Sequence, residues 1–384
     1  MSVPGVPPGS AGRAIHPSLR EEDVSELVPT LPAGRYCAAP DGRDDAVLAR
    51  SWQLVALTTD LDAPGRYVRA EATGRSVLVV NDGGTVRAWH NVCPHRGAEL
   101  VTADRGTVRS LRCPYHAWTY GLDGALRAAP GLTPVPDLTL SGLRVAVRDP
   151  FVFVTFSADT APFDEMFGDL FDSIAEFGVD LPTLARQSDV ETLDFPVRAD
   201  WKIVVENSLE CYHCAVAHPG LASSLDLRTY RQQTATWWSV QRSPMRGEAG
   251  GRGDGIGADA RIAATSGGGQ AEARFHFLFP NLFVSVWPGS AGFSYTLVRP
   301  LPDGTTRSEY RRFHGPGATE RERADSRSFI RQVIDEDVAL CESVQRGLRS
   351  GAIPHGWLRI GGVGADESCI AHFGDLVRRL TADG

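Results

Sequence analysis

Two short runs of the sequence each contain one cysteine and one histidine, and they constrain the fold more than any other feature. The runs are Cys93-Pro94-His95-Arg96-Gly97 and Cys113-Pro114-Tyr115-His116. Two thiolates and two imidazoles can hold a tetrahedral zinc ion, or a two-iron, two-sulfur cluster in which histidines bind one iron. A zinc finger usually opens with a Cys-x2-4-Cys pair and closes with two histidines. Each run here supplies one ligand of each kind, so we predict the cluster.

Both runs resemble the cluster-binding signature of the Rieske non-heme iron oxygenases, and the second run continues the likeness through Ala117-Trp118-Thr119-Tyr120. The family usually has glycine where Ala117 stands. The resemblance implies that two cysteines hold the inner iron of a Rieske 2Fe-2S cluster and two histidines the outer iron; these ligands would be Cys93, Cys113, His95 and His116. Because neutral imidazoles replace two thiolates, such a cluster is easier to reduce than an all-cysteine cluster.

Composition, charge and hydropathy bound the class of protein. The chain has 384 residues, which exceeds the size at which a single core usually stops growing, so we expect two domains. A net charge of -8 argues against nucleic-acid binding, which needs a basic face. No run approaches the roughly 20 apolar residues of a membrane span, and the first residues lack a signal-peptide pattern. Seven cysteines fit a reducing compartment better than a disulfide framework, so we expect a soluble, cytoplasmic protein.

Residue patterns divide the chain into three parts. We expect residues 1–40 to contain a tail and a short helix, which a capping-box pattern at Ser18–Glu21 opens and which should end before Pro29. Short alternating runs separated by glycine-containing turns predict an antiparallel β domain over residues 41–158, with the cluster loops at one end. Helical and strand patterns alternate over residues 159–384, which predicts an α+β domain.

The glycine-rich segment 246–272 has few large apolar residues and no periodicity, so we expect a flexible loop. It could be a solvated insertion, which is the commoner case, or a lid over a pocket. Strands are expected after the loop, and Phe275, Phe277 and Phe279 share one strand face. Such aromatic residues usually belong to the core, but any that line a pocket could hold a cation or stack on an aromatic substrate.

A second group of metal-binding residue types lies between Asp200 and Pro219. Asp200 is suited to cap a helix, in which residues at i, i+4 and i+7 would share one face: Glu206, Glu210 and His213. His218 follows His213 by five residues, so both can point at one ion only if the helix breaks between them. Pro219 favours that break, because the residue before a proline is pushed out of the α region.

This segment too resembles the oxygenase family, whose catalytic helix carries an acid and two histidines at the same spacing. The resemblance implies that His213 and His218 bind a mononuclear iron, and we assign catalytic roles to Glu210 and Asn207. In the family the acid at Glu210 is not a ligand but bridges to a cluster histidine of the neighbouring subunit, since members are commonly homotrimers. Glutamate there resembles the branch that acts on quaternary ammonium compounds such as choline, carnitine and glycine betaine.

Cys211 and Cys214 allow another interpretation of the same segment. They could form a redox Cys-x2-Cys pair or, with the histidines, a zinc clip. No thioredoxin-like βαβ pattern surrounds them, so we expect small apolar side chains that pack beside the ligand.

A 2-His-1-carboxylate iron site still needs its acid. In a helix expected from about Arg323 to Ser350, apolar residues form a stripe: Ile330, Ile334, Cys341, Val344 and Leu348. Asp337 falls in the one gap of that stripe, whereas Asp335, Glu336 and Glu342 lie off its centre, on solvated or flanking faces. An acid that faces the core needs a compensating charge, and iron is such a charge. A salt bridge or helix cap is the alternative, and the family resemblance agrees with Asp337 as the mononuclear iron ligand.

The sequence therefore predicts an α+β oxygenase component, with an N-terminal antiparallel β Rieske domain and a catalytic domain of helices on an antiparallel sheet. The resemblance implies a helix-grip, START-like form for the catalytic domain. No Gly-x-Gly-x-x-Gly element is present for a nicotinamide or flavin, so electrons must come from a separate reductase of flavin or ferredoxin type.

The predicted reaction uses O2 and a mononuclear Fe(II) to hydroxylate a small organic substrate. We favour a quaternary ammonium compound or an N-methylated amine, mainly on Glu210, with mono- or dioxygenation left open. The alternatives are hydroxylation of an aromatic ring, oxidation of a natural product, and electron transfer by a Rieske protein without mononuclear iron.

Overall fold

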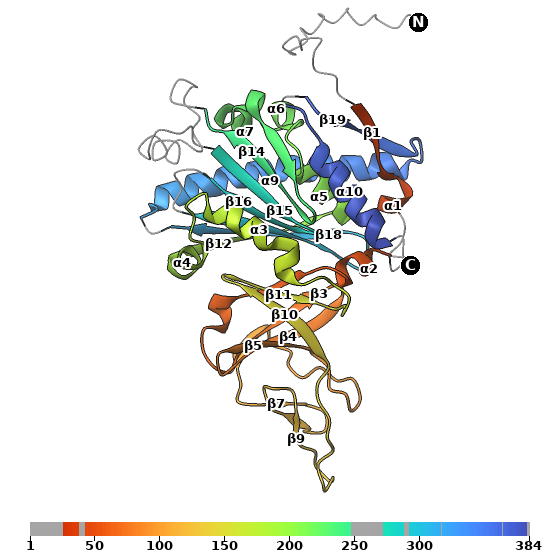
Figure 1. The fold of residues 1–384 in the computed structure, drawn as a ribbon, viewed down its shortest axis with the longest axis vertical. Helices are drawn as coiled ribbons and strands as arrows, with labels where there is room; N and C mark the ends of the chain where they lie inside the picture. The colour runs from red at the N-terminus through yellow and green to blue at the C-terminus, as the bar shows by residue number, and fades with distance from the viewer. Residues whose placement is uncertain are drawn as a thin grey trace, which may run out of the picture.

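The computed structural model describes residues 26–37, 43–246, 272–287, 292–315, 317–362 and 364–381. The predicted N-terminal tail, the helix start at Ser18 and nearly all of the predicted loop 246–272 lie outside these residues. Figure 1 shows two units along the long axis of the molecule, a β-rich one below and a mixed one above. No helix in the described part of the chain is both long and apolar enough to cross a bilayer.

The lower unit is built on a seven-stranded antiparallel sheet with the order β2-β11-β10-β5-β4-β3-β6. The run from Val77 to Val80 is fully buried in it, which suits β-branched side chains on a sheet that is covered on both faces. A small sheet, β7-β8-β9, lies toward the lower tip (Figure 1). The strands are β2 Gln53–Leu57, β3 Arg66–Ala72, β4 Arg75–Asp82, β5 Thr85–His90, β6 Arg105–Thr107, β7 Leu111–Arg112, β8 Thr119–Tyr120, β9 Leu126–Ala128, β10 Gly142–Arg148 and β11 Phe151–Thr155.

The upper unit has a second seven-stranded antiparallel sheet, ordered β12-β18-β17-β16-β15-β14-β13. Its strands are β12 Asp189–Val197, β13 Arg231–Thr234, β14 Trp238–Pro244, β15 Glu272–Leu278, β16 Leu282–Val286, β17 Phe293–Pro300 and β18 Thr306–His314. Its helices are α3 Phe163–Ala175, α4 Leu181–Gln187, α5 Trp201–Ser208, α6 Cys214–Ala217, α7 Pro219–Ser224, α9 Glu320–Arg349 and α10 Ser368–Thr381, with a 3-10 turn at Leu227–Thr229. Helices on an antiparallel sheet confirm the predicted α+β class.

Helices cover both faces of the upper sheet. On one face, α3 packs in a core with Val240, Val284 and Tyr295. On the other face, residues of α5, α9 and α10 pack with Phe277 and Val298. The first core also takes in side chains of β2 and β11, so the two units share one apolar interior and are held together by it.

The N-terminal part departs from the predicted helix. Residues Glu26–Pro32 form strand β1, which pairs antiparallel with β19, His355–Ile360. The predicted helix is therefore wrong over residues 26–28, because pairing with a strand distant in sequence outweighs the local capping pattern. The short helices α1 Gly34–Cys37 and α2 Arg43–Ala49 connect β1 to the lower unit.

Candidate active site

The two cysteine–histidine turns have matching backbone geometry. In each, the amide four residues after the cysteine donates to the cysteine carbonyl, from Gly97 to Cys93 at 2.9 Å and from Ala117 to Cys113 at 3.1 Å. Gly97 and Ala117 both adopt left-handed backbone conformations, with φ of 77° and 60°. The alanine therefore occupies a conformation that favours glycine. Two copies of one loop thus present their side chains to the same place.

The four predicted cluster ligands divide into buried thiols and more exposed imidazoles. Cys93 and Cys113 are buried, and the rings of His95 and His116 meet edge to face with centroids 4.6 Å apart. Nδ1 of His116 is buried and has no hydrogen-bond partner in the described part of the chain, so it is available to a metal. The donor set and its arrangement fit a Rieske cluster.

The segment from Asp200 to Pro219 consists of three short pieces. Asp200 caps α5 as predicted, its carboxylate accepting from the amide of Lys202 at 2.9 Å, and α5 ends at Ser208. His218 ends α6 with a ψ of 71°, outside the α region, and Pro219 begins α7. The predicted break before the proline is therefore present, and it lets the two histidines face each other.

The prediction that Glu206, Glu210 and His213 share one helix face is wrong. The helix ends before Glu210, so the spacing no longer sets the direction of the later side chains. Glu206 faces another part of the interior, where its carboxylate accepts a hydrogen bond from the Tyr36 hydroxyl at 2.7 Å.

Cys211 and Cys214 are joined by a disulfide on either side of His213. The turn that follows α5 brings their Cα atoms to 4.9 Å, within the range that a disulfide can bridge. The pair also packs with Tyr230, so the predicted packing role is present but incomplete. While bonded, neither sulfur can serve as the thiolate of a zinc clip.

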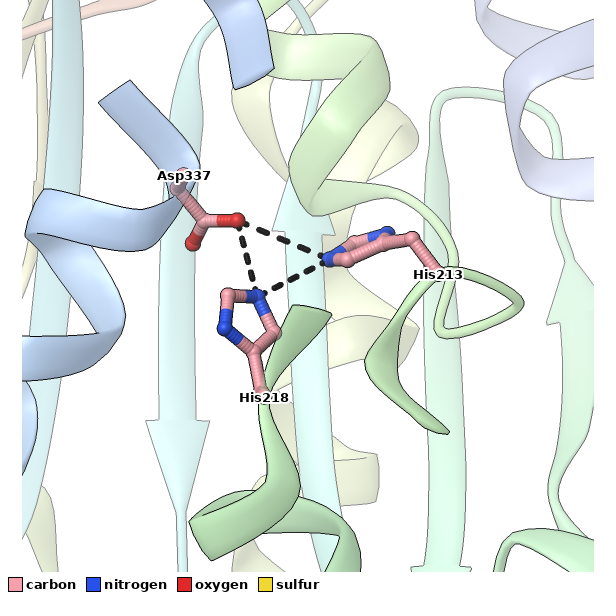
Figure 2. A group of neighbouring side chains, drawn as sticks. All are labelled: His213, His218 and Asp337. Atoms are coloured by element: carbon pink, nitrogen blue, oxygen red, sulfur yellow. Dashed lines mark hydrogen bonds and ion pairs between the residues drawn. The ribbon is translucent and has the colours of Figure 1, made fainter. Parts of the chain in front are cut away.

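Three side chains from separate elements meet at one point: His213, His218 and Asp337 (Figure 2). The two Nε2 atoms lie 3.1 Å apart, and Oδ1 of Asp337 lies 2.9 Å from Nε2 of His218 and 3.5 Å from Nε2 of His213. Three cis ligands at about 2.1 Å from an octahedral ion would be about 3 Å from one another. The triangle therefore fits a 2-His-1-carboxylate iron site.

Three polar side chains hold this triangle in position. Asn207 donates from Nδ2 to Oδ1 of Asp337 at 2.7 Å. Glu210 accepts from Nδ1 of His213, and Glu336 accepts from Nδ1 of His218 at 2.7 Å. Because an acid fixes the outer nitrogen of each histidine, both Nε2 atoms are directed to the metal position.

Glu336 is the residue of this group that sequence reasoning missed. The helical stripe predicts it on a flanking face, and that face turns out to lie against His218. An acid directly beside a predicted iron ligand was the available signal, since metal-binding histidines commonly donate to a second carboxylate. The stripe itself is wrong at Val344, which is 48% exposed, whereas Gln345 is buried and accepts from the amide of Asp200.

The surrounding acids strongly favour positive charge at this point. Burial opposes the charge of His213, but hydrogen bonds with Asp337 and Glu210 raise the pKa of the imidazole to about 10. Burial likewise opposes the charge of Asp337, yet hydrogen bonds from His213 and His218 lower the pKa of its carboxyl to about 2. A divalent cation bound at this point would displace these protons and take up the same negative charge.

A pocket lies between α9 and the sheet and reaches one corner of the triangle, Asp337. The space measures about 740 Å³, part of it open to solvent, and Asn207 and Asp337 are in its wall. Aromatic rings line it from the sheet side: Phe195, Phe275, Trp287 and Tyr310. Phe275 belongs to the strand whose aromatic face was predicted, while Phe277 and Phe279 are buried in the core.

Comparisons with known proteins agree with this architecture. A family model described as Rieske 2Fe-2S domain matches residues 51–139, and one described as ring hydroxylating alpha subunit, catalytic domain, matches residues 184–383. The carnitine monooxygenase oxygenase subunit of Acinetobacter pittii is 30% identical over 321 residues, which cover 80% of this chain and 81% of that protein. The choline monooxygenase of Arabidopsis thaliana chloroplasts is 29% identical, over 87% of this chain and 82% of that protein.

A solved quaternary ammonium Rieske monooxygenase has a similar structure, with a TM-score of 0.78 and 26% identity over 92% of this chain and 96% of that one. Like its relatives, the chain is an oxygenase component that requires a separate reductase and a small-molecule substrate. It carries a Rieske 2Fe-2S cluster in the lower unit and a mononuclear iron in the upper unit. The chain belongs to the ring-hydroxylating oxygenase alpha-subunit family and is a Rieske non-heme iron oxygenase.

Proposed function

We propose that this oxygenase hydroxylates a quaternary ammonium compound or N-methylated amine at a carbon next to nitrogen. The observation that carries the proposal is the lining of the pocket. It contains four aromatic rings, and Asp337 is the one charged side chain among its described residues. Aromatic faces attract a cation through their quadrupole, and the described lining contains no lysine or arginine that would repel it. Relatives named for carnitine and choline oxidation support the same substrate class.

We assign the mononuclear iron to His213, His218 and Asp337, and the cluster to Cys93, His95, Cys113 and His116. When bound, the iron supplies oxygen activation and the cluster supplies electrons one at a time. Asn207 holds the Asp337 carboxylate, and Glu210 and Glu336 fix the tautomers of the two histidines. The proposed domains are residues 41–158 and 159–384, which the matched spans 51–139 and 184–383 support.

The strand register supports a pose for the cationic head. Phe195 in β12 lies opposite Ser308 in β18, and both belong to the pocket wall with Asp337. A trimethylammonium group against Phe195 would put its methyl carbons beside the iron position. Hydroxylation of a methyl carbon there gives a carbinolamine, in which the C–N bond then breaks. The carbon leaves as formaldehyde, the hydroxyl proton is released, and the nitrogen keeps the bonding pair as a tertiary amine.

A homotrimer is the proposed assembly, with electrons passing from the cluster of one subunit to the iron of the next. In Figure 1 the small β7-β8-β9 sheet lies toward the lower tip of the molecule, whereas α6 and α7, which flank the iron-binding histidines, lie near its upper end. Glu210 already contacts His213 and is proposed to reach a cluster histidine of the neighbour. In protein saturated with both metals, Glu210→Gln should then slow single-turnover electron delivery. A cytoplasmic location and a flavin- or ferredoxin-type reductase remain predictions.

The decisive experiment measures substrate-dependent oxygen uptake with a surrogate reductase. Choline, carnitine and glycine betaine are compared with naphthalene and with 3,3-dimethylbutanol, the uncharged carbon isostere of choline. We expect uptake with at least one ammonium compound and none with its neutral isostere. Phe195→Leu should raise KM for the cation, while Phe195→Tyr, which keeps the ring, should not. Uptake with the arene alone would favour aromatic hydroxylation instead.

A further inference from the structure

The pocket has two chemically different walls. Helix α9 contributes an apolar wall made of Ile330, Val333, Ile334, Val338 and Cys341. The sheet contributes hydroxyl groups from three adjacent strands: Ser285 of β16, Ser294 and Thr296 of β17, and Ser308 of β18. A wall rich in hydroxyls is unusual for a site that recognises only a trimethylammonium head, because methyl groups on nitrogen accept no hydrogen bond.

Ser308 differs from the other hydroxyl residues of the wall. Its side chain is fully buried, and Oγ has no hydrogen-bond partner among the residues that the structure describes. A buried polar group without a partner costs about 1–3 kcal/mol. Rotation about χ1 between staggered positions is the small movement that turns this hydroxyl toward the pocket. A ligand oxygen that meets it there would offset the cost.

The position of Ser308 along the pocket follows from two ion pairs to α9, one from β12 and one from the residue just after β12. Arg327 binds Glu191 at 2.8 Å, and Arg198 binds Glu342 at 2.9 Å. The helix therefore runs alongside the strand. A helix rises about 1.5 Å per residue and a strand about 3.3 Å, so counting from the two ion pairs places Asp337 level with Phe195.

Phe195 faces Ser308 in the sheet register, so the unpartnered hydroxyl lies at the iron end of the pocket. The far end has a corner of two rings, Phe275 and Trp287, whose planes meet at 86°. Across the sheet, Phe275 is in register with Ser285, Ser294 and Arg312. Arg312 is four residues from Ser308 in β18, so Phe275 lies about 13 Å from Ser308 along the strand direction.

The charge of the wall narrows the kind of oxygen that Ser308 would meet. Three of the described lining residues can ionise: Asp337, Tyr310 and Cys341. None of the described lining residues is a lysine or an arginine. Arg312 is the neighbour of Ser294 in register but lies outside that lining. Asp337 is assigned to the iron, so the described lining offers a substrate carboxylate no cationic side chain to pair with, whereas a hydroxyl needs no such partner.

We propose that Ser308 is a substrate-binding residue that hydrogen-bonds an uncharged hydroxyl of the substrate, close to the ammonium group that is oxidised. This assignment rests on the proposed function, because it deepens the substrate class from a quaternary ammonium compound to an amino alcohol. Burial, the missing partner and the register beside Phe195 all concern this one side chain.

The test compares substrates that differ by one hydroxyl in the reconstituted enzyme with surrogate reductase. The pairs are choline with n-propyltrimethylammonium, and carnitine with γ-butyrobetaine. We expect the wild type to favour the hydroxyl-bearing member by about five- to tenfold in kcat/KM, the value of one hydrogen bond. Ser308→Ala should abolish this preference by raising KM for the hydroxyl-bearing member alone, and should leave the melting temperature unchanged or higher.

Ser243→Ala is the matched control. Ser243 is a fully buried serine of the same sheet, its Oγ also lacks a described partner, and it is not in the pocket wall. Its substitution should leave the preference intact. A wild type without the preference, a preference that survives Ser308→Ala, or a higher kcat/KM for glycine betaine than for choline would each overturn the inference. Absence of uptake with every ammonium compound would instead overturn the proposed function.

Discussion

The Rieske turns and the mononuclear site bind metals through different uses of the chain. All four cluster ligands lie within residues 93–116, and each turn is shaped by its own backbone hydrogen bonds. The mononuclear ligands span residues 213–337 and meet only because α9 packs beside the break between α6 and α7. Local turns can form before the domain is complete, whereas the triangle needs the tertiary fold and three supporting side chains.

The largest effect is expected when His213 is removed from the mononuclear site. With His213→Ala, the Asp337 carboxylate and His218 alone cannot hold iron in a facial site, so oxygenation should be abolished. The visible and EPR signals of the cluster should remain, because its turns make their hydrogen bonds independently. Iron should fall from about three to about two per chain, by the ligand sets of the two sites. Retained turnover in the variant would contradict the assignment of this histidine.

A second test concerns Glu206, which directly precedes Asn207 in α5 but faces Tyr36 and not the iron site. Burial raises the pKa of this carboxyl to about 8, although the hydrogen bond from Tyr36 opposes the shift. In the folded state Glu206 therefore keeps its proton up to a pH near 8, whereas in the unfolded state the carboxyl loses it above its ordinary pKa of 4.5. This contribution to stability is complete at acidic pH and is lost as pH rises toward 8.

Glu206→Gln, which stays neutral, should gain stability relative to the wild type between pH 5 and pH 9, by an amount on the order of 3 kcal/mol. Urea unfolding across that range measures it. Glu342→Gln is the control: hydrogen bonds from Arg198 lower the pKa of Glu342, so its effect should be constant over the same range. Parallel pH profiles for wild type and Glu206→Gln would show that the buried carboxyl is ionised.

A third, smaller effect is expected at Glu336, whose carboxylate supports the His218 ligand of the mononuclear site. Glu336→Gln keeps the size of the side chain but removes the charge that fixes Nδ1 of His218. Loss of such a partner typically lowers metal affinity by about 10- to 100-fold. Competition with a ferrous chelator measures it. The cluster content serves as the internal control, and an unchanged affinity would mean that the hydrogen bond does not support the iron.

The same contrast explains what the sequence could and could not predict. Cysteine and histidine spacing is enough for the Rieske turns, because their geometry is local. Asp337 could be found as the polar gap in an apolar stripe, since helical periodicity carries its direction across the long helix α9. Periodicity failed where a helix ended, as between Glu206 and Glu210, and where a flanking face met another element, as at Glu336.

Local patterns also failed where distant pairing decided the structure. The capping box at Ser18 predicts a helix into residues that pair with β19 instead. The disulfide between Cys211 and Cys214 depends on how tightly the chain turns after α5, which spacing alone does not give. Ser308 carried no signal at all, because a serine in a strand becomes informative only when its burial and missing partner are known.

The smallest predicted effect is on the stability of the cluster turns. Gly97 and Ala117 occupy equivalent positions in the two turns, both with left-handed backbone conformations. An L-residue in this conformation costs about 1 kcal/mol that glycine does not incur. Ala117→Gly should relieve that strain, although the added freedom of the unfolded chain offsets part of the gain.

Gly97→Ala is the reverse substitution at the equivalent position of the other turn. A Cβ added there meets no atom within 4 Å, so only backbone strain should be introduced. We expect thermal loss of the cluster absorbance to shift upward by a few degrees in Ala117→Gly and downward in Gly97→Ala, by about 1 kcal/mol or less in each case. Oxygenase activity at low temperature should stay the same in both variants. Shifts of the same sign would show that the two turns do not share one backbone mechanism.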